Sequence, residues 1–312
     1  MIYNNIDVAI ILPCYNEEKT IEKVINDIRA LGYNDIFVIN NNSTDRSKEI
    51  ALNNRCIVID ETRQGKGNAI RKAFTDINAN VYVMIDSDDT YDVSSLENMI
   101  SLVKNEDYDM VIGDRLSTSY YTENKRPMHN FGNNMVRWTI NKIFKGKVTD
   151  ILTGYRVLSR RFVKTFPIMS DGFQIETEMT IHLLDNRYKY ICIPCGYKDR
   201  QEGSVSKLNT YRDGFKVIGM MYNLYKEYKP KQYYDILSII LAIISTVFIV
   251  PVLKDYIATG LVLRFPTLIA CCFVYLMSIQ LYCIGEILNQ RRNSDKKVLE
   301  MEIIKEATNK NM

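Results

Sequence analysis

The C-terminal third of the chain contains two long stretches without a charged residue. Residues 236–253 form an uncharged stretch of 18 residues, and residues 265–285 form one of 21 residues. At about 1.5 Å of rise per residue, a helix of either length crosses a hydrocarbon layer of about 30 Å. A buried core helix is the alternative for each stretch alone, but the chain ahead of them already supplies a core. We therefore expect a transmembrane helical hairpin over residues 233–289.

Basic residues lie mainly on the two outer flanks of this hairpin. The flanking basic residues are Lys226, Lys229, Lys231, Arg291, Arg292, Lys296 and Lys297. The segment between the stretches has only Lys254 and Arg264, with Asp255 as a counter-charge. Cytoplasmic flanks of membrane helices carry an excess of Lys and Arg. We expect a multi-pass protein of the cell (plasma) membrane, with both termini, residues 1–230 and a tail over residues 290–312 in the cytoplasm.

The first 115 residues alternate short apolar runs with amphipathic segments. The strand-like runs are residues 6–12, 36–39, 56–59, 81–85 and 110–112. Residues 21–31 and 69–77 place apolar side chains at helical spacing. This alternation predicts an α/β fold with a Rossmann-like, mostly parallel sheet. Ligands of such sheets bind beyond the carboxyl ends of the strands, and the polar clusters of this sequence follow those ends.

Composition narrows the class of protein further. With 312 residues, of which 46% are hydrophobic and 25% charged, the chain can bury a core of useful size. The net charge of +3 is too small to indicate a nucleic-acid binder. Seven cysteines without framework spacing indicate a reducing compartment. Cys192 and Cys195 form a lone CxxC pair, which favours structural thiols over a zinc site.

An acidic cluster directly follows the fourth strand-like run. Asp86 and Asp88 flank Ser87, and side chains one residue apart on extended backbone point the same way. Two carboxylates facing one ligand repel each other unless a cation lies between them. Mg²⁺ or Mn²⁺, bridging to substrate phosphates, is suited to that position. The pattern predicts a metal site with Asp88 as the better ligand and Asp86 as the second, although acidic clusters are common in loops.

Three further segments give this cluster a setting. Residues 13–17 read Pro-Cys-Tyr-Asn-Glu, residues 40–42 are three asparagines, and residues 65–67 read Gly-Lys-Gly before a helix. Together with the Asp-Ser-Asp segment they resemble the family 2 glycosyltransferases, which have the nucleotide-sugar GT-A fold. The resemblance implies a nucleotide-sugar donor in contact with Pro13, Tyr15, Asn16, Glu17, Asn40, Asn41, Lys66, Asp86, Ser87 and Asp88.

The resemblance has one departure, at the second strand end. The family usually carries acids where this chain has Asn40 and Asn41. An amide carbonyl accepts a hydrogen bond from a base but supplies no charge. The identity of the base therefore stays open; UDP-N-acetylglucosamine or UDP-glucose is the expected donor.

A second set of segments is similar to the polyprenyl-phosphate sugar transferases, the dolichol-phosphate mannose synthase group. Residues 150–156 read Asp-Ile-Leu-Thr-Gly-Tyr-Arg, residues 113–115 read Gly-Asp-Arg, and residues 199–207 begin with Asp-Arg and end with Ser-Lys. This resemblance implies transfer to a lipid phosphate such as undecaprenyl phosphate, with inversion, in cell-envelope glycan synthesis. It assigns Arg200, Ser206 and Lys207 to the donor pyrophosphate. For the anionic lipid phosphate we expect Arg115 and Arg126, which lie between the Asp-Ser-Asp segment and the hairpin in the sequence, because arginine binds phosphate in bidentate fashion.

Two local alternatives stay open in the middle of the chain. Residues 131–144 have an amphipathic pattern around Trp138, which fits either a surface helix or an interfacial helix over residues 129–146. Glu176 and Glu178 either position the donor sugar or serve as acids at a helix N-terminus.

Two other functions and two kinds of partner are also compatible with the chain. One function is transfer to a sugar hydroxyl in polysaccharide or glycolipid synthesis, for which two spans and the missing Q-x-x-R-W motif are unusual. The other is a non-catalytic nucleotide-sugar-binding scaffold, against which the intact Asp86 and Asp88 argue. The hairpin is compatible with a homo-oligomer or a small membrane partner protein.

Overall fold

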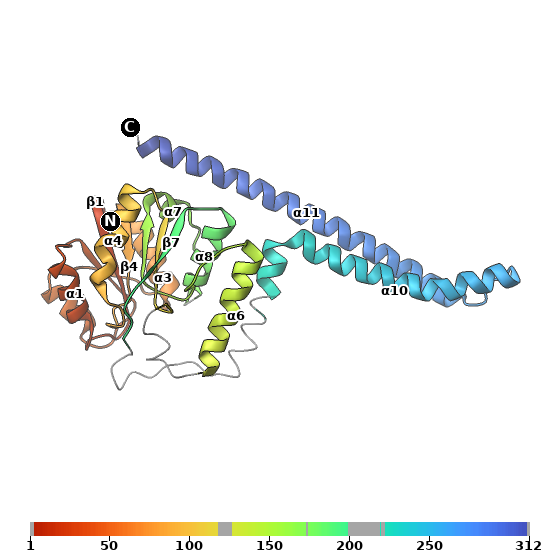
Figure 1. Cartoon of the computed structure of the whole chain (residues 1–312), viewed down its shortest axis with the longest axis horizontal. Helices are drawn as coiled ribbons and strands as arrows, with labels where there is room; N and C mark the ends of the chain where they lie inside the picture. The colour runs from red at the N-terminus through yellow and green to blue at the C-terminus, as the bar shows by residue number, and fades with distance from the viewer. Residues whose placement is uncertain (1–2, 118–126, 173, 199–218, 220–221, 311–312) are drawn as a thin grey trace. The chain divides into compact units, whose positions relative to one another are not determined.

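The computed structural model describes residues 3–117, 127–172, 174–198, 219 and 222–310. The chain divides into two compact units, Met1–Tyr211 with Glu302–Met312, and Arg212–Met301. The first unit contains a β-sheet with its helices, and the second contains two long helices (Figure 1). The predicted domain boundary at residue 230 stays a prediction.

A seven-stranded sheet forms the centre of the first unit, with the strand order β3-β2-β1-β4-β6-β5-β7. The strands are β1 (Tyr3–Cys14), β2 (Ile36–Asn40), β3 (Ile57–Asp60), β4 (Ile77–Met84), β5 (Met110–Asp114), β6 (Arg156–Ser159) and β7 (Tyr190–Pro194). Pairing is parallel for β3-β2, β2-β1, β1-β4 and β5-β7, and antiparallel where β6 joins β4 and β5. The sheet is therefore mostly parallel, as predicted.

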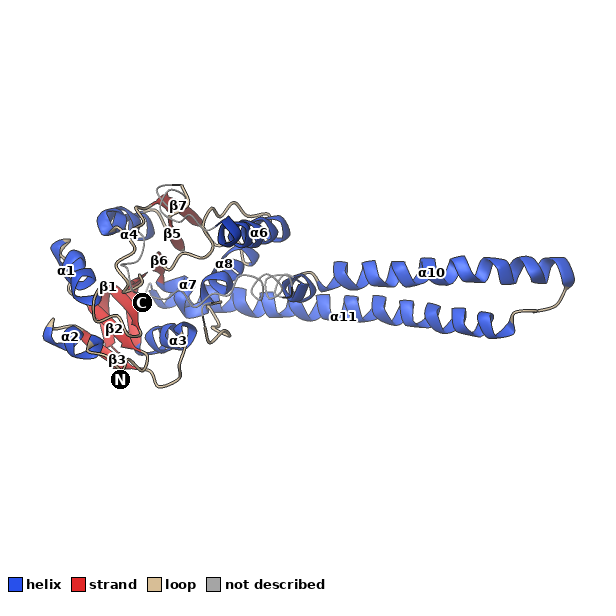
Figure 2. Cartoon of the chain, turned by 90° about the horizontal axis from the view of Figure 1, so that it is seen from below, coloured by secondary structure: helices blue, strands red, loops and turns tan. Residues whose placement is uncertain are grey.

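Helices cover both faces of this sheet. They are α1 (Ile21–Ala30), α2 (Ser47–Asn53), α3 (Lys66–Asp76), the 3₁₀ turn η1 (Val93–Ser95), α4 (Leu96–Asn105), α6 (Pro127–Phe144), α7 (Arg160–Thr165) and α8 (Ile175–Asp185). α1, α2 and α4 pack on one face, and α3, α7 and α8 lie on the other (Figure 2).

Burial explains why the apolar runs of the sequence become strands. All five residues of β2 are buried, as expected for a strand of a parallel sheet that is covered on both faces. In β1, Val8, Ile10 and Leu12 point into the core beside α1, and α1 contributes apolar residues at helical spacing, Ile21, Val24, Ile25 and Ile28. One predicted boundary is wrong: Ile77 opens β4 instead of closing the preceding helix, because its backbone is extended.

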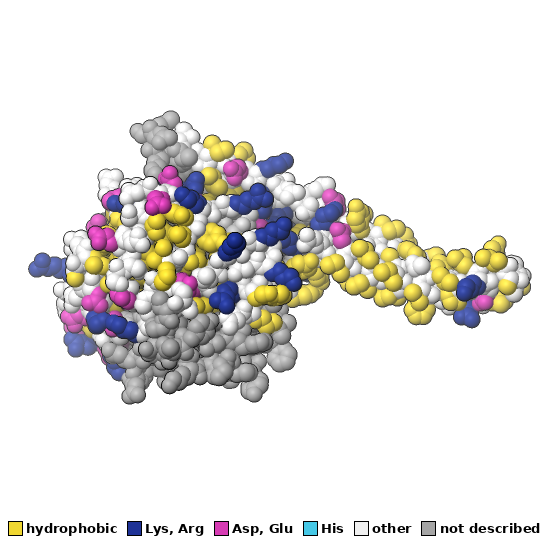
Figure 3. All heavy atoms as spheres, viewed as in Figure 1, with side chains coloured by type: hydrophobic (Ala, Val, Ile, Leu, Met, Phe, Trp, Pro, Cys, Tyr) yellow, Lys and Arg dark blue, Asp and Glu magenta, His cyan; other side chains and the backbone are white. Residues whose placement is uncertain are grey.

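The second unit is a helical hairpin of α10 (Pro230–Thr259) and α11 (Phe265–Lys310), both long and apolar enough to cross a membrane. Hydroxyl groups lie between the helices: the Ser278 hydroxyl donates to the Ser238 carbonyl at 2.9 Å, and the Ser245 hydroxyl donates to the Cys271 carbonyl at 2.9 Å. Over residues 236–253 and 265–285, the exposed side chains are mostly apolar (Figure 3). Small polar residues inside and apolar residues outside are typical of helix pairs in lipid.

His182 gives the first unit a pH-dependent contribution to stability. The ring packs against Phe162, Phe166 and Tyr188 at centroid distances of 5.3–5.5 Å. Burial lowers the pKa of His182 to about 4. The unfolded chain binds a proton near pH 6.5, whereas the folded chain resists it. The neutral ring therefore makes its full contribution to the free energy of unfolding above pH 6.5. About 3 kcal/mol of that free energy is lost as the pH falls toward 4.

We expect His182→Leu to flatten this part of the pH dependence. The melting temperature of the detergent-solubilised chain should fall between pH 7.5 and pH 5 by several degrees more for the wild type than for the variant. Thermal unfolding at the two pH values measures the difference. Parallel declines of the two proteins would contradict the assignment to His182.

Candidate active site

The loops after β1 and β4 meet at the carboxyl ends of these neighbouring strands. The Ser87 hydroxyl donates to the Pro13 carbonyl at 2.5 Å, and the Thr20 hydroxyl donates to the Ser87 carbonyl at 2.7 Å. Ser87 is buried, so its side chain joins the two loops instead of pointing to solvent. These bonds hold Asp86 and Asp88 beside the segment that carries Tyr15 and Glu17.

The loops after β1 and β2 are also bonded to each other. The Glu17 amide donates to the Ser47 hydroxyl at 2.7 Å, and the Thr44 amide donates to the Asn16 side-chain oxygen at 2.8 Å. Asn16 has a φ of 56°, in the left-handed region that Asn tolerates better than most residues. The Tyr15 side chain is 41% exposed at this edge. The predicted site residues Tyr15, Asn16 and Glu17 therefore lie together on one rim, whereas Cys14 between Pro13 and Tyr15 is buried in the core.

Asn40 and Asn41 fasten the loop that precedes α3. The Asn41 side-chain NH₂ group donates to the carbonyls of Glu61 at 3.0 Å and Arg63 at 2.7 Å, and its side-chain oxygen accepts from the Gly65 backbone amide at 2.7 Å. Asn40 donates to the Asp60 carboxylate at 2.8 Å. A carboxylate cannot donate to carbonyls. This explains structurally why asparagine stands at this strand end, where the family usually has acids.

Lys66 lies at the centre of the site, at the start of α3. Its ammonium is hydrogen-bonded to the Asp86 carboxylate and lies 2.6 Å from a Glu176 oxygen on α8. The side chains of Lys66 and Glu176 are only 8% and 5% exposed. Burial opposes the charged form of Lys66, but Asp86 and Glu176 outweigh it and hold the pKa of the ammonium above its ordinary value.

Gly65 lets the backbone before Lys66 approach a neighbouring loop. Its φ is +132°, and a Cβ there would lie 2.2 Å from the Asp171 carbonyl oxygen. The Asn68 amide donates to that same carbonyl at 3.3 Å. The loop around residues 169–171 is held in turn by Glu178, which accepts from the amides of Met169 and Ser170.

Asp86 is confined on its other side by the segment that follows Thr153. A Cβ at Gly154 would lie 2.2 Å from an Asp86 carboxylate oxygen, so only glycine leaves room for that carboxylate. The Gly154 amide donates to the Tyr91 hydroxyl at 2.8 Å. The neighbouring carboxylate, Asp88, is buried and accepts from the Thr90 hydroxyl at 2.6 Å.

Asp86 and Asp88 supply hard oxygen ligands, which suit Mg²⁺ or Mn²⁺. Among the residues that the structure describes, three or more His, Cys, Asp or Glu side chains are nowhere arranged to hold a metal ion. A divalent ion at this pair would therefore need oxygen ligands beyond the described side chains, such as waters or a bound molecule. Two carboxylates completed by substrate phosphates are an ordinary magnesium arrangement.

Arg115 is anchored by an acid from a distant part of the sequence. Its guanidinium donates to the two Asp150 carboxylate oxygens at 2.7 and 3.0 Å. It also lies 5.5 Å from the centre of the Tyr197 ring and 5.9 Å from that of Tyr91. Two segments that the sequence connects to one group of proteins, residues 113–115 and 150–156, thus meet. The predicted site residues Arg126, Arg200, Ser206 and Lys207 lie outside the described residues.

The structure adds residues that the motifs did not assign. Arg156 is fully buried and donates to the carbonyls of Ile151 at 2.6 Å and Thr153 at 3.1 Å, which shapes the loop ahead of Gly154. Of the two acids left open at the start of α8, Glu176 reaches Lys66 and Glu178 does not. Arg156 is the last residue of the motif at residues 150–156, so the sequence did contain a signal for it. No sequence pattern distinguishes Glu176 from Glu178.

Known proteins resemble this chain in sequence. AglJ, a glycosyltransferase of Haloferax volcanii, is 34% identical over 228 residues, which are 73% of this chain and 75% of AglJ. A dolichyl-phosphate hexose transferase of the same organism is 28% identical over 210 residues, which are 67% of this chain and 89% of that protein.

Among solved structures, the fold is similar to that of glucosyl-3-phosphoglycerate synthase from Mycobacterium tuberculosis in complex with UDP. The TM-score is 0.56 at 20% sequence identity, over 70% of this chain and 80% of the synthase. Residues 9–166 match the model of the family described as Glycosyl transferase family 2. The chain therefore belongs to glycosyl transferase family 2.

Proposed function

We propose that this glycosyltransferase moves a sugar from a nucleotide-sugar donor, UDP-N-acetylglucosamine or UDP-glucose, to a polyprenyl phosphate for cell-envelope glycan synthesis. The observation that carries the proposal is the meeting of Lys66, Asp86 and Gly154, one from each of three motifs, at the carboxyl ends of parallel strands. The apolar hairpin supports a lipid acceptor. So does the relative named dolichyl-phosphate hexose transferase.

The donor side of the proposal rests on Asp86 and Asp88. Crystals of the mycobacterial synthase, matched here with a TM-score of 0.51, contain Mn²⁺ and UDP-glucose. In this chain Asp88 and Asp86 would hold such an ion together with the donor phosphates. The bound ion would stabilise the charge of the departing nucleoside diphosphate. The rim formed by Tyr15, Asn16 and Glu17 is the proposed contact for the nucleoside.

The acceptor side rests on the chemistry of the nucleophile. A lipid phosphate is already anionic near pH 7 and attacks the sugar C1 without giving up a proton to a base. A sugar hydroxyl would need a carboxylate base. Among the acids of the described residues, Glu176 is the buried carboxylate that shares Lys66 with Asp86, and its oxygen is engaged by the Lys66 ammonium. This contact favours the lipid phosphate over transfer to a sugar hydroxyl.

Arg115 is the proposed contact for the lipid phosphate. Asp150 fixes the plane of the guanidinium through two hydrogen bonds, so the guanidinium is oriented before the acceptor arrives. The roles of Arg126, Arg200, Ser206 and Lys207 stay predictions from the sequence.

Helix α6 supports the proposed location at a membrane surface. Residues 127–149 contain no acid and four basic residues, Arg137, Lys142, Lys145 and Lys147. The only tryptophan of the chain, Trp138, is 60% exposed, with the Lys142 ammonium 4.4 Å from the centre of its ring. Basic residues and Trp are typical of interfacial helices on anionic lipid. We infer that this helix contacts lipid headgroups.

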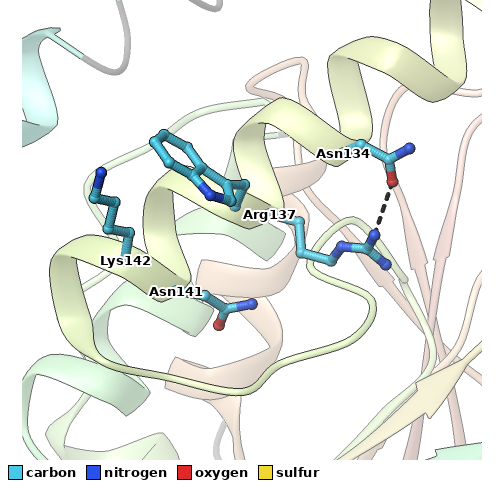
Figure 4. Close-up of a pocket in the computed structure, with 5 residues that line it drawn as sticks. Asn134, Arg137, Asn141 and Lys142 are labelled. Carbon is cyan, nitrogen blue, oxygen red and sulfur yellow. Dashed lines mark hydrogen bonds between the residues drawn. The ribbon is translucent and has the colours of Figure 1, made fainter.

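The side chains around Trp138 form a shallow hollow with a volume of about 600 Å³ (Figure 4). It is lined by Asn134, Arg137, Trp138, Asn141 and Lys142. The Arg137 guanidinium donates to the Asn134 side-chain oxygen at 2.9 Å and to the Thr149 carbonyl at 3.2 Å. These bonds hold a positive charge at the wall of the hollow, which suits an anionic headgroup.

Asp88→Asn should lower sugar transfer by at least about 100-fold while the chain stays folded, since a bound metal ion supplies several kcal/mol of transition-state stabilisation. The assay incubates purified protein with Mn²⁺, undecaprenyl phosphate and labelled UDP- or GDP-sugars, and counts label in the lipid extract. Label should enter the lipid with at least one UDP-sugar. A wild-type protein that labels no lipid from any donor would refute the proposed reaction.

Gly154→Ala should lower transfer by about 100-fold, because a displacement of about 1 Å at a reacting group costs that much. The added Cβ would overlap the Asp86 carboxylate. Gly219→Ala is the matched control, since among the described residues a Cβ there meets no atom within 4 Å apart from its own neighbours in the chain. Equal activity of both variants in the lipid-labelling assay would contradict a role of Asp86 in the reaction.

Trp138 provides its own test of the interfacial helix. In nanodiscs of anionic lipid, brominated acyl chains should quench the fluorescence of the full chain, and Lys142→Glu with Lys145→Glu should lower that quenching at least about twofold, as each basic residue near the surface adds about 1 kcal/mol. Lys48→Glu, on α2, is the control and should change little. Quenching that is absent, or equal in the α6 variant, would contradict the interfacial position.

A further inference from the structure

The Lys66 ammonium occupies the position of a cation next to Asp86. It is hydrogen-bonded to the Asp86 carboxylate and lies 2.6 Å from Glu176, with its side chain 8% exposed. We propose that Lys66 acts as an internal cation that makes divalent-metal binding at Asp86 and Asp88 depend on the bound donor. The inference rests on the proposed function and adds that the two ligands depend on each other: donor and metal bind together, and metal alone binds weakly.

Lys66 is held where it is by the backbone on both sides. The Gly65 amide donates to the Asn41 side chain at 2.7 Å, and the Asn68 amide donates to the Asp171 carbonyl at 3.3 Å. Gly65 packs directly against the Asp171 carbonyl. Because the loop is fixed and Glu176 bonds the ammonium from α8, Lys66 stays beside Asp86 as a built-in part of the site.

The two candidate metal ligands are both engaged within the protein. One Asp86 oxygen accepts from Lys66, and the other lies close to Gly154, where an added Cβ would overlap it. The Asp88 Oδ1 atom accepts from the Thr90 hydroxyl at 2.6 Å and from the Thr90 amide at 3.3 Å. A divalent ion must therefore compete with an ammonium for Asp86, and two carboxylates give it few of the six ligands that it needs.

A diphosphate changes this balance. Its oxygens supply the missing ligands, and its negative charge attracts the divalent ion more strongly than Lys66 repels it. The same ammonium lies next to Asp86, where the diphosphate charge would arrive, and contributes to binding it. Lys66 thus weakens the site for metal alone and strengthens it for metal with donor.

The test measures the affinity for Mn²⁺ alone, by the electron paramagnetic resonance signal of free Mn²⁺, in the full chain in detergent. Lys66→Met by itself leaves Glu176 buried without its partner. The main variant therefore combines Lys66→Met with Glu176→Gln, which leaves the summed charge of Lys66, Asp86, Asp88 and Glu176 unchanged. It should bind Mn²⁺ at least about tenfold more tightly than the wild type, because the ammonium next to the ion is gone.

Three controls separate the explanations. Glu176→Gln alone keeps Lys66 on Asp86 and should bind Mn²⁺ no more tightly than the wild type. Lys66→Arg keeps the positive charge and should stay within about threefold of the wild type, a difference well below that expected from removing a contacting charge. Adding Asp88→Asn to the main variant should abolish the gain, which locates the ion. Mn²⁺ affinity of the main variant equal to that of the wild type would overturn the inference.

Titrations with UDP and with GDP keep this inference apart from the proposed function. In the wild type, one of the two nucleotides should raise the Mn²⁺ affinity strongly, and the gap to the main variant should shrink. Tight Mn²⁺ binding by the wild type that neither nucleotide improves overturns the role of Lys66, even where lipid labelling succeeds. Failure of lipid labelling with every donor overturns the proposed function itself.

Discussion

The buried contact of Lys66 with Asp86 and Glu176 is the interaction on which the site depends. It joins the start of α3, the end of β4 and the start of α8, which are far apart in the sequence. Each of these charges would be costly to bury alone, because a charge loses its hydration and needs a partner to replace it. Their mutual pairing therefore fixes the three elements to one geometry, and the loops around them are shaped to permit it.

Much of this geometry follows from the order of polar segments along the sequence. Parallel strands end at one edge, so the segments after β1, β2 and β4 had to meet there. The apolar runs marked these strands because both faces of the sheet are covered. The order of segments does not predict the role of Asn41. Its side-chain NH₂ group donates to the carbonyls of Glu61 and Arg63, which only the folded loop brings within reach.

Other parts of the site could not be predicted because they depend on tertiary contacts. Arg156 carries a charge that normally marks a surface position, yet carbonyls and a hydroxyl satisfy it in a fully buried pocket. Glu176 and Glu178 lie in the same helical turn, and only the direction of α8 decides which reaches Lys66. The antiparallel strand β6 is short, and no separate apolar run marks it in the sequence.

The glycines of the site show how a motif records a steric requirement. At Gly154 the missing side chain leaves room for the Asp86 carboxylate, and at Gly65 it leaves room for the Asp171 carbonyl. Both positions therefore limit where Asp86 and Lys66 lie relative to each other. A site that handles a diphosphate gains from such rigidity, because charged groups held in place before the ligand arrives need no reorganisation when charge develops. The glycines and the buried ion pair thus act together to keep the charges at the carboxyl ends of the strands in a fixed arrangement.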